Sequence, residues 1–256
     1  MSMLNNDVPT DEEAAFFFKN MVLSPKSRVS RMQVDSKLLA GAGGDDLIGE
    51  EIPTVIGFAD GVSPEKREAL QNCALLSEVW ADEQCDRHVE PLKWYRHYES
   101  TMKNCGWFST SFAFNDHQSS QTNVTMDSVV LDIVKLVAGV NTAAVLPLLG
   151  RVFDKIKKNT DAITLFDNNS KKGSLASCQI MPCVESAGGT AITVITGIEC
   201  AFSSNEGGAW FWYWKTSNMK IKRASIVMEL NHTIYKRREE MILEKLDKIS
   251  SSFFDL

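Results

Sequence analysis

One stretch of the chain, residues 138–150, carries no charged side chain and lies inside a longer helix-forming segment, residues 127–158. The segment holds too many apolar residues to form one stripe along a helix. Thirteen residues of helix cover about 20 Å, which is shorter than the roughly 30 Å hydrocarbon core of a membrane. We therefore expect either a helical hairpin buried in the core or a concealed hairpin that acts on membranes. Gly139 and Pro147 are expected to divide or bend it.

The apolar side chains of this segment are the first candidates for membrane contact. The small residues among them allow helices to approach each other closely. A single pass through a membrane by residues 138–150 alone is not expected, whereas insertion as part of an oligomer remains open. The candidates are Val137, Val140, Val145, Leu146, Leu148 and Leu149.

Composition sets broad limits on the kind of protein. With 256 residues, 44% of them hydrophobic and 23% charged, the chain can bury a sizeable core. The formal net charge of -6 argues against nucleic-acid partners, which need a basic surface, and against simple electrostatic capture by anionic lipid.

The N-terminus and the cysteines bear on the cellular compartment. Acidic residues stand where a secretory signal would carry basic ones, so we expect synthesis in the cytoplasm without a signal peptide, followed by release to act outside the cell. The six cysteines occur in helical and strand-like patterns and are expected to be free thiols. No cysteine or histidine spacing matches a metal site, so neither a metal nor a cofactor is expected.

The pattern of elements predicts an α+β fold. Residues 1–60 are interpreted as an N-terminal arm or adaptor, with a helix at 11–23 that Thr10 caps, a flexible loop at 41–46 and one strand at 52–58; residues 61–256 form the α+β domain. Ser63 and Pro64 mark a helix start, Pro91 breaks that run, and a second helix ends at Gly106.

The strands are expected to form an antiparallel β-meander packed with several helices in a single compact domain. In the strand at 107–114, Phe108, Phe112 and Phe114 are expected on one side. A further strand is expected to begin at 163–166. Four more strand candidates are 175–184, 190–202, 209–216 and 219–230, and Asn231 is expected to cap a final helix.

Three indoles share one face of the strand candidate at 209–216, because Trp210, Trp212 and Trp214 alternate along it. On a covered sheet this face would be core, as large aromatic side chains usually are. It is otherwise a platform for glycans or a belt at a membrane interface, with Lys215 beside it.

No catalytic motif is present, so we do not expect an enzyme. There is no phosphate-binding loop of the GxxxxGK[ST] type and no GxSxG elbow. Paired acids such as Asp45 and Asp46 are interpreted as solvated. An enzyme of unfamiliar type would require His97, His117 or Cys105 to converge with acids in a pocket.

From about residue 94 onward the order of segments resembles a largely uncharacterised family of bacterial and fungal α+β proteins. The segments that carry the resemblance are GWFSTSFAF (106–114), TMDSVVLDIV (125–134), ITLFD (163–167), CQIMPC (178–183), WFWYWK (210–215) and VMELNHTIYKRRE (227–239). The chain is also similar to small insecticidal proteins of pseudomonads. This resemblance implies a soluble toxin of gut epithelium, with no catalytic or cofactor-binding residues to transfer.

The leading hypothesis is a soluble, insecticidal bacterial toxin that binds an epithelial cell surface and then disturbs its membrane. One way to disturb the membrane would be an oligomeric pore. Its partners would be a host cell-surface receptor or the membrane, and further copies of the chain. The apolar segment would disturb the membrane, and the indoles with Lys215 would contact the surface. The alternative is a non-enzymatic module that binds a protein or a glycan.

Overall fold

The structure, a computed structural model, describes residues 8–24, 46–49, 53–117, 125–172, 175–201, 220–249 and 253–255. In this part of the chain the helices are α1 Asp11–Asn20, α3 Pro64–Gln84, α4 Pro91–Asn104, α5 Met126–Val137, the 3-10 turn η1 Gly139–Asn141, α6 Thr142–Lys158, α7 Thr160–Ser170 and α8 His232–Leu246. The strands are β1 Leu47–Gly49, β2 Thr54–Phe58, β3 Trp107–His117, β4 Lys171–Lys172, β5 Leu175–Glu185, β6 Ala191–Ala201, β7 Lys220–Leu230 and β8 Phe253–Asp255.

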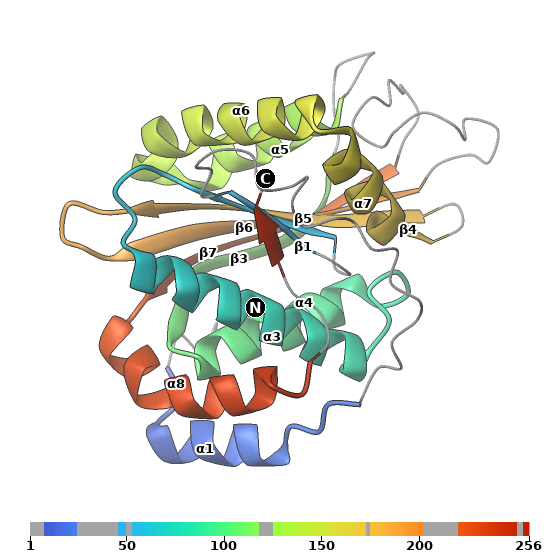
Figure 1. Ribbon diagram of the computed structural model, residues 1–256. Helices are drawn as coiled ribbons and strands as arrows, with labels where there is room; N and C mark the ends of the chain where they lie inside the picture. The colour runs from blue at the N-terminus through green and yellow to red at the C-terminus, as the bar shows by residue number, and fades with distance from the viewer. Residues whose placement is uncertain are drawn as a thin grey trace.

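All the described strands join one sheet, and helices cover both of its faces (Figure 1). The strand order is β3-β7-β6-β5-β2-β1-β8, with β4 paired to β5 outside this path. Helices α5 and α6 lie on one face, while α3, α4 and α8 lie on the other, with α1 packed outside α8. The chain is thus a single α+β domain with the sheet as its middle layer.

Strands β5, β6 and β7 are antiparallel to one another as expected, with β6 paired directly to β7, and β3 extends this part of the sheet by pairing antiparallel with β7. One pairing was not foreseen. Strand β2 lies parallel to β5, with Val55 opposite Ile180 and Gly57 opposite Pro182. The sheet is therefore mixed, and a strand from the first 60 residues lies well inside it. The strand candidate at 209–216 lies outside the described residues.

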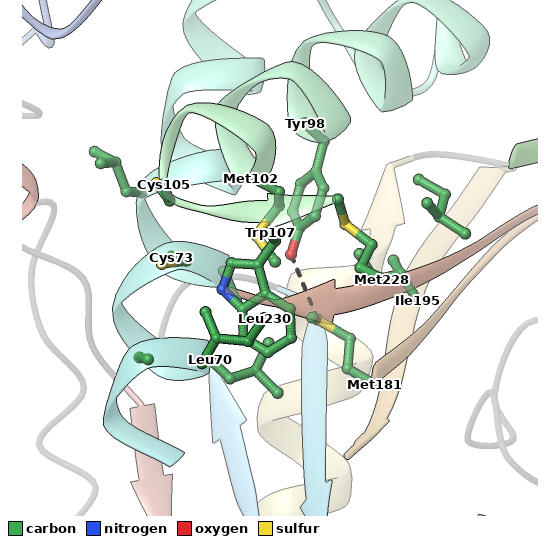
Figure 2. Packing of buried hydrophobic residues seen from close by; sticks show 14 of the residues in the cluster. Leu70, Cys73, Tyr98, Met102, Cys105, Trp107, Met181, Ile195, Met228 and Leu230 are labelled. Carbon is green, nitrogen blue, oxygen red and sulfur yellow. Dashed lines mark hydrogen bonds between the residues drawn. The ribbon is translucent and has the colours of Figure 1, made fainter. Parts of the chain in front are cut away.

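On the face covered by α3 and α4, the side chains of α4 pack directly on the sheet. Trp94, Tyr98, Met102 and Cys105 are all buried, and their spacing along the sequence places them on one face of the helix. Figure 2 shows the Tyr98 ring among methionine side chains that include Met181 of β5, to whose sulfur its hydroxyl donates a hydrogen bond of 3.4 Å. Large aromatic and flexible sulfur-containing side chains fill this half of the core.

The described parts of residues 1–60 pack against this same core. Thr10 caps α1 in a reciprocal arrangement with Glu13, as predicted for this position. Arg238 of α8 donates hydrogen bonds to the carboxylate of Asp11 in α1 and to the backbone oxygen of Asn104 at the end of α4, each at 3.0 Å. The side chain of Arg238 is almost fully buried, and its hydrogen bonds link α1, α8 and the end of α4.

The two other helix starts predicted from capping residues lie where expected, with one difference. Asn231 accepts a hydrogen bond from the backbone N–H of Ile234 at 3.1 Å and caps α8. Helix α3 begins at Pro64, but the hydroxyl of Ser63 makes no capping hydrogen bond. The backbone N–H of Ser63 instead donates to Glu185, which ties this helix start to the end of β5.

Two local predictions were wrong. Residues 163–166, expected as a strand, belong to helix α7, where Ala162 and Ile163 are buried against the α5–α6 side of the core. Strand β3 has a bulge at Thr110, so that Phe108 pairs with Glu229 whereas Phe112 and Phe114 pair with Ile226 and Ala224. The inserted residue moves Phe108 to the opposite face of the sheet from the other two phenylalanines.

Candidate functional site

Helix α5, turn η1 and helix α6 form one layer over the sheet, which we call the α5–α6 layer (residues 126–158). Gly139 adopts a φ of 53°, a left-handed conformation that ends α5 and allows the chain to reverse direction. The predicted division at Gly139 is therefore confirmed, whereas α6 continues through Pro147. At the start of α5 the backbone N–H of Thr125 donates to the hydroxyl of Ser128.

The inner face of the layer is fully apolar. It lies on a sheet surface that includes Cys178, Ile180, Val194 and Ile198. Ten apolar side chains of the layer larger than alanine are almost completely shielded from solvent: Val129, Val130, Ile133, Val134, Val145, Leu148, Leu149, Val152, Phe153 and Ile156. Burial of ten such side chains contributes roughly 15 to 30 kcal/mol, before the entropy cost of folding is subtracted.

The six apolar candidates separate into three classes of exposure. Val145, Leu148 and Leu149 are buried against the sheet, and Val137 and Leu146 are half-buried at its border. Val140 is 97% exposed, on the turn between the two helices. The layer is thus neither a central hairpin covered on all sides nor wholly exposed. It is an outer layer with an apolar inner face and a mixed outer face.

Charged side chains join α6 to the start of β1 and to the end of β2. The carboxylate of Asp46 is fully buried and accepts hydrogen bonds from Lys155 Nζ at 2.6 Å and from the backbone N–H of Phe58 at 3.0 Å. Arg151 lies 3.6 Å from the same carboxylate and donates to the backbone oxygen of Phe58. Asp46 therefore joins α6 to β2, close to the start of β1.

Gly57 brings α6 unusually close to the sheet. A Cβ atom added to Gly57 would lie 2.5 Å from Cγ2 of Val152, which is too short for a non-bonded contact. Val152 is completely buried at this point. Only glycine allows the helix and the strand to approach to this distance, so residue 57 sets how tightly the layer packs.

A second ion pair joins the two helices of the layer. Lys157 Nζ of α6 lies 2.5 Å from the carboxylate of Asp127 in the first turn of α5. Burial by itself would raise the pKa of Asp127, but hydrogen bonds from Lys157 and Thr125 outweigh it and hold that pKa below its ordinary value of 3.8. Asp127 is therefore ionised at neutral and mildly acidic pH.

Asp46 and Arg151 were not predicted as partners. Asp46 was interpreted as one of a solvated pair, because acids beside glycines usually lie in exposed loops. Its position directly before the apolar residues Leu47 and Ile48 is the only signal that it begins a buried strand. The partners on α6 could not be found from sequence, since they lie more than 100 residues away.

The predicted surface-contact residues Trp210, Trp212, Trp214 and Lys215 lie outside the described residues. The histidines with described side chains belong to three separate elements: His88 lies between α3 and α4, His97 on α4, and His232 at the start of α8. Cys105 is buried at the end of α4.

The described residues include no helix that is both long and apolar enough to cross a membrane. They also include no group of three or more histidine, cysteine, aspartate or glutamate side chains arranged to hold a metal ion.

No protein-family model matches the sequence, and no curated protein matches it significantly. Solved structures with a similar arrangement include the Evf virulence factor (9% identity, 82% of this chain and 88% of that chain, TM-score 0.42) and a delta-endotoxin (12% identity, 82% and 91%, TM-score 0.40). Another is the activated Cyt2Ba monomer from Bacillus thuringiensis subsp. israelensis (9% identity, 70% and 97%, TM-score 0.34). These likenesses are too distant to assign the chain to a family or to an activity.

Proposed function

We propose that this protein is a toxin that acts on membranes without a catalytic step, and that the α5–α6 layer separates from the sheet at the lipid surface. The observation that carries the proposal is the construction of this layer. It is a hairpin with a wholly apolar inner face, and its described polar links to the strands beneath it are made by Arg151 and Lys155 near Asp46.

The energy of the apolar contact explains why a membrane would be required. Losing the burial of ten side chains to water would cost roughly 15 to 30 kcal/mol, more than the roughly 5 to 15 kcal/mol by which a whole domain is usually stable. The layer would therefore stay closed in water. Lipid can receive the same apolar side chains, so that much of this cost disappears at a bilayer.

The lengths of the helices favour a position in the plane of the membrane. Helix α6, with 17 residues, is about 26 Å long, and α5, with 12 residues, is about 18 Å long. Both are shorter than the roughly 30 Å hydrocarbon core. An amphipathic helix can lie at the interface with its apolar face toward the acyl chains and its charges toward water.

The proposal is tested by dye release from vesicles, beginning with vesicles made from insect midgut brush-border membranes. Binding and release are measured together, and the heat-denatured protein serves as the control. We expect dose-dependent release, with hydrogen exchange of α5 and α6 backbone amides becoming faster on the vesicles than in buffer. Absence of release despite binding would contradict membrane disturbance.

One observation favours a second function, a module that binds a protein or glycan and keeps its layer in place. The inner face of the layer is packed as closely as an ordinary core, as the near-zero exposure of Val130 and Leu149 shows. This function predicts binding to brush-border membranes without dye release. It also predicts unchanged hydrogen exchange in α5 and α6 when the protein is bound.

A further inference from the structure

The turn between α5 and α6 exposes apolar side chains at the end of the layer. Val140 on η1 is 97% exposed, and Leu136 near the end of α5 is 68% exposed. Five neighbours are also exposed or half-buried: Val137, Gly139, Ala143, Ala144 and Pro147. We call residues 136–147 the apolar tip. It is continuous with the buried inner face, because Val145 near its end and Leu148 directly after it are both buried in α6.

The tip contains no charged residue. Lys135 precedes it and Arg151 follows it, and the sequence between them has no aspartate, glutamate, lysine or arginine. Lys135 lies 3.5 Å from Asp132, and Arg151 lies 3.5 Å from Asp60, so the flanking cations each have an acidic neighbour. Attraction of the tip to a partner would therefore be hydrophobic and not electrostatic.

At its turn the backbone of the tip is hydrogen-bonded to itself and to the last turn of α5. The N–H of Ala138 donates to the oxygen of Val134, and the N–H of Asn141 donates to the oxygen of Ala138, each at 2.9 Å. The hydroxyl of Thr142 donates to the oxygen of Gly139 at 2.6 Å. A segment that leaves water for lipid needs such internal partners, because lipid supplies no hydrogen bonds.

We propose that the apolar tip is the first part of the chain to enter a lipid bilayer, and that its ligand is the boundary between headgroups and acyl chains. A protein partner fits the tip less well, because binding energy at protein interfaces is concentrated in tryptophan, tyrosine and arginine, and the tip has none of these. The inference rests on the proposed membrane action and specifies where that action starts.

A probe at position 140 tests the inference. The cysteines of the chain are all buried, so Val140→Cys introduces a single accessible thiol for an environment-sensitive fluorophore such as NBD. Val89→Cys is the matched control, because Val89 is 74% exposed and belongs to the connection between α3 and α4. Each labelled protein is mixed with phosphatidylcholine vesicles, with and without 20% phosphatidylserine.

We expect the emission of the probe at position 140 to shift to the blue and to increase about threefold on both kinds of vesicle, while the probe at position 89 changes little. Val140→Asp should lower vesicle binding roughly tenfold, since it removes an apolar side chain and adds a charge, and Val89→Asp should not. Both aspartates would replace exposed valines, so the far-ultraviolet circular dichroism and the thermal midpoint should not change.

Dye release by the same samples separates this inference from the proposed function. If the wild type releases dye while the probe at position 140 stays in water and Val140→Asp keeps full binding, the tip inference is wrong and the membrane action stands. A probe shift at position 140 without dye release would support the tip and contradict membrane disturbance. Equal loss of binding in Val140→Asp and Val89→Asp would also overturn the assignment to the tip.

Discussion

The ammonium group of Lys155 lies 2.6 Å from the carboxylate of Asp46, across 109 residues of sequence. Asp46 is completely buried, whereas Lys155 keeps about a third of its side chain in solvent. A buried carboxylate requires several donors, and here Lys155 and the backbone N–H of Phe58 provide them. The pair connects the α5–α6 layer to the sheet where the start of β1 lies beside the end of β2.

Replacing Asp46 should weaken this connection more than any single surface charge. We expect Asp46→Ala to lower the free energy of unfolding by about 2 to 3 kcal/mol, because the N–H of Phe58 loses its acceptor while Lys155 can turn to water. Asp60→Ala is the control, since the Asp60 side chain is 97% exposed and should contribute less than about 0.5 kcal/mol. Urea denaturation of both variants measures the difference, and equal effects would contradict the role of Asp46.

The contact between Gly57 and Val152 gives a second prediction. Gly57→Ala should lower stability by about 1 to 3 kcal/mol, since the new methyl group would overlap Val152. Gly57→Ala combined with Val152→Ala should cost at least about 1 kcal/mol less than the two single losses together. Gly150→Ala in α6 is the matched control: nothing lies within 4 Å of its added Cβ, so stability should rise by about 0.5 to 1 kcal/mol. Additive losses at positions 57 and 152 would show that α6 and β2 do not press on each other there.

The Asp127 and Lys157 pair gives a pH dependence. Because folding lowers the pKa of Asp127 below 3.8, the carboxylate stabilises the folded state fully above about pH 4 to 5, and this contribution is lost as the pH falls through the lower folded value. Asp127→Asn should therefore cost about 1 kcal/mol at pH 7, and the difference from wild type should disappear once the pH has fallen below the folded-state pKa of Asp127.

The control for this prediction is Asp132→Asn on the same helix. Asp132 and Lys135 are both about half exposed, so the substitution should change stability very little at any pH. Chemical denaturation at several pH values measures both variants. A gap between wild type and Asp127→Asn that closes already at pH 6 would mean that this pair opens in mild acid.

Much of the fold could be predicted because its signals are local. Thr10, Pro64 and Asn231 mark helix starts through capping and proline geometry, which depend on a few adjacent residues. Turn residues between the stretches that form β5, β6 and β7 indicated separate strands, and short connections favoured antiparallel pairing. These features led to the correct α+β class.

Other features depend on contacts that are distant in sequence. The parallel pairing of β2 with β5 joins residues more than 120 positions apart. Residues 163–166 have the composition of a strand but belong to α7, whose Ile163 is buried in the same apolar cluster as the layer. The bulge at Thr110 places Phe108 on the opposite face of the sheet, and no glycine or proline within the strand indicates it.

The candidate site was predicted in part for the same reason. The absence of charge in residues 138–150 and the turn at Gly139 are local, and both correctly marked the hairpin. The exposure of each apolar residue depends on which side of the layer faces the sheet, so Val140 and Val145 could not be distinguished in advance. The pairing of Lys155 with Asp46 could not be predicted, because the two residues are 109 positions apart and only the fold brings them together.

The measurement that tests the central claim most directly is dye release by a protein whose layer is locked to the sheet. Gly57→Cys combined with Val152→Cys places two thiols where a disulfide can form, because the Cβ of residue 57 would nearly touch the side chain of residue 152. The native cysteines are buried, and burial raises the pKa of Cys183 and Cys200 to about 12, so they should not compete.

The oxidised and reduced forms of this variant are compared on the same vesicles, with each single cysteine variant as a control. If the α5–α6 layer must leave the sheet, the oxidised form will bind the vesicles without releasing dye, and reduction by dithiothreitol will restore release. Release by the oxidised form at the rate of the reduced form, with the disulfide verified by mass spectrometry, would contradict the account.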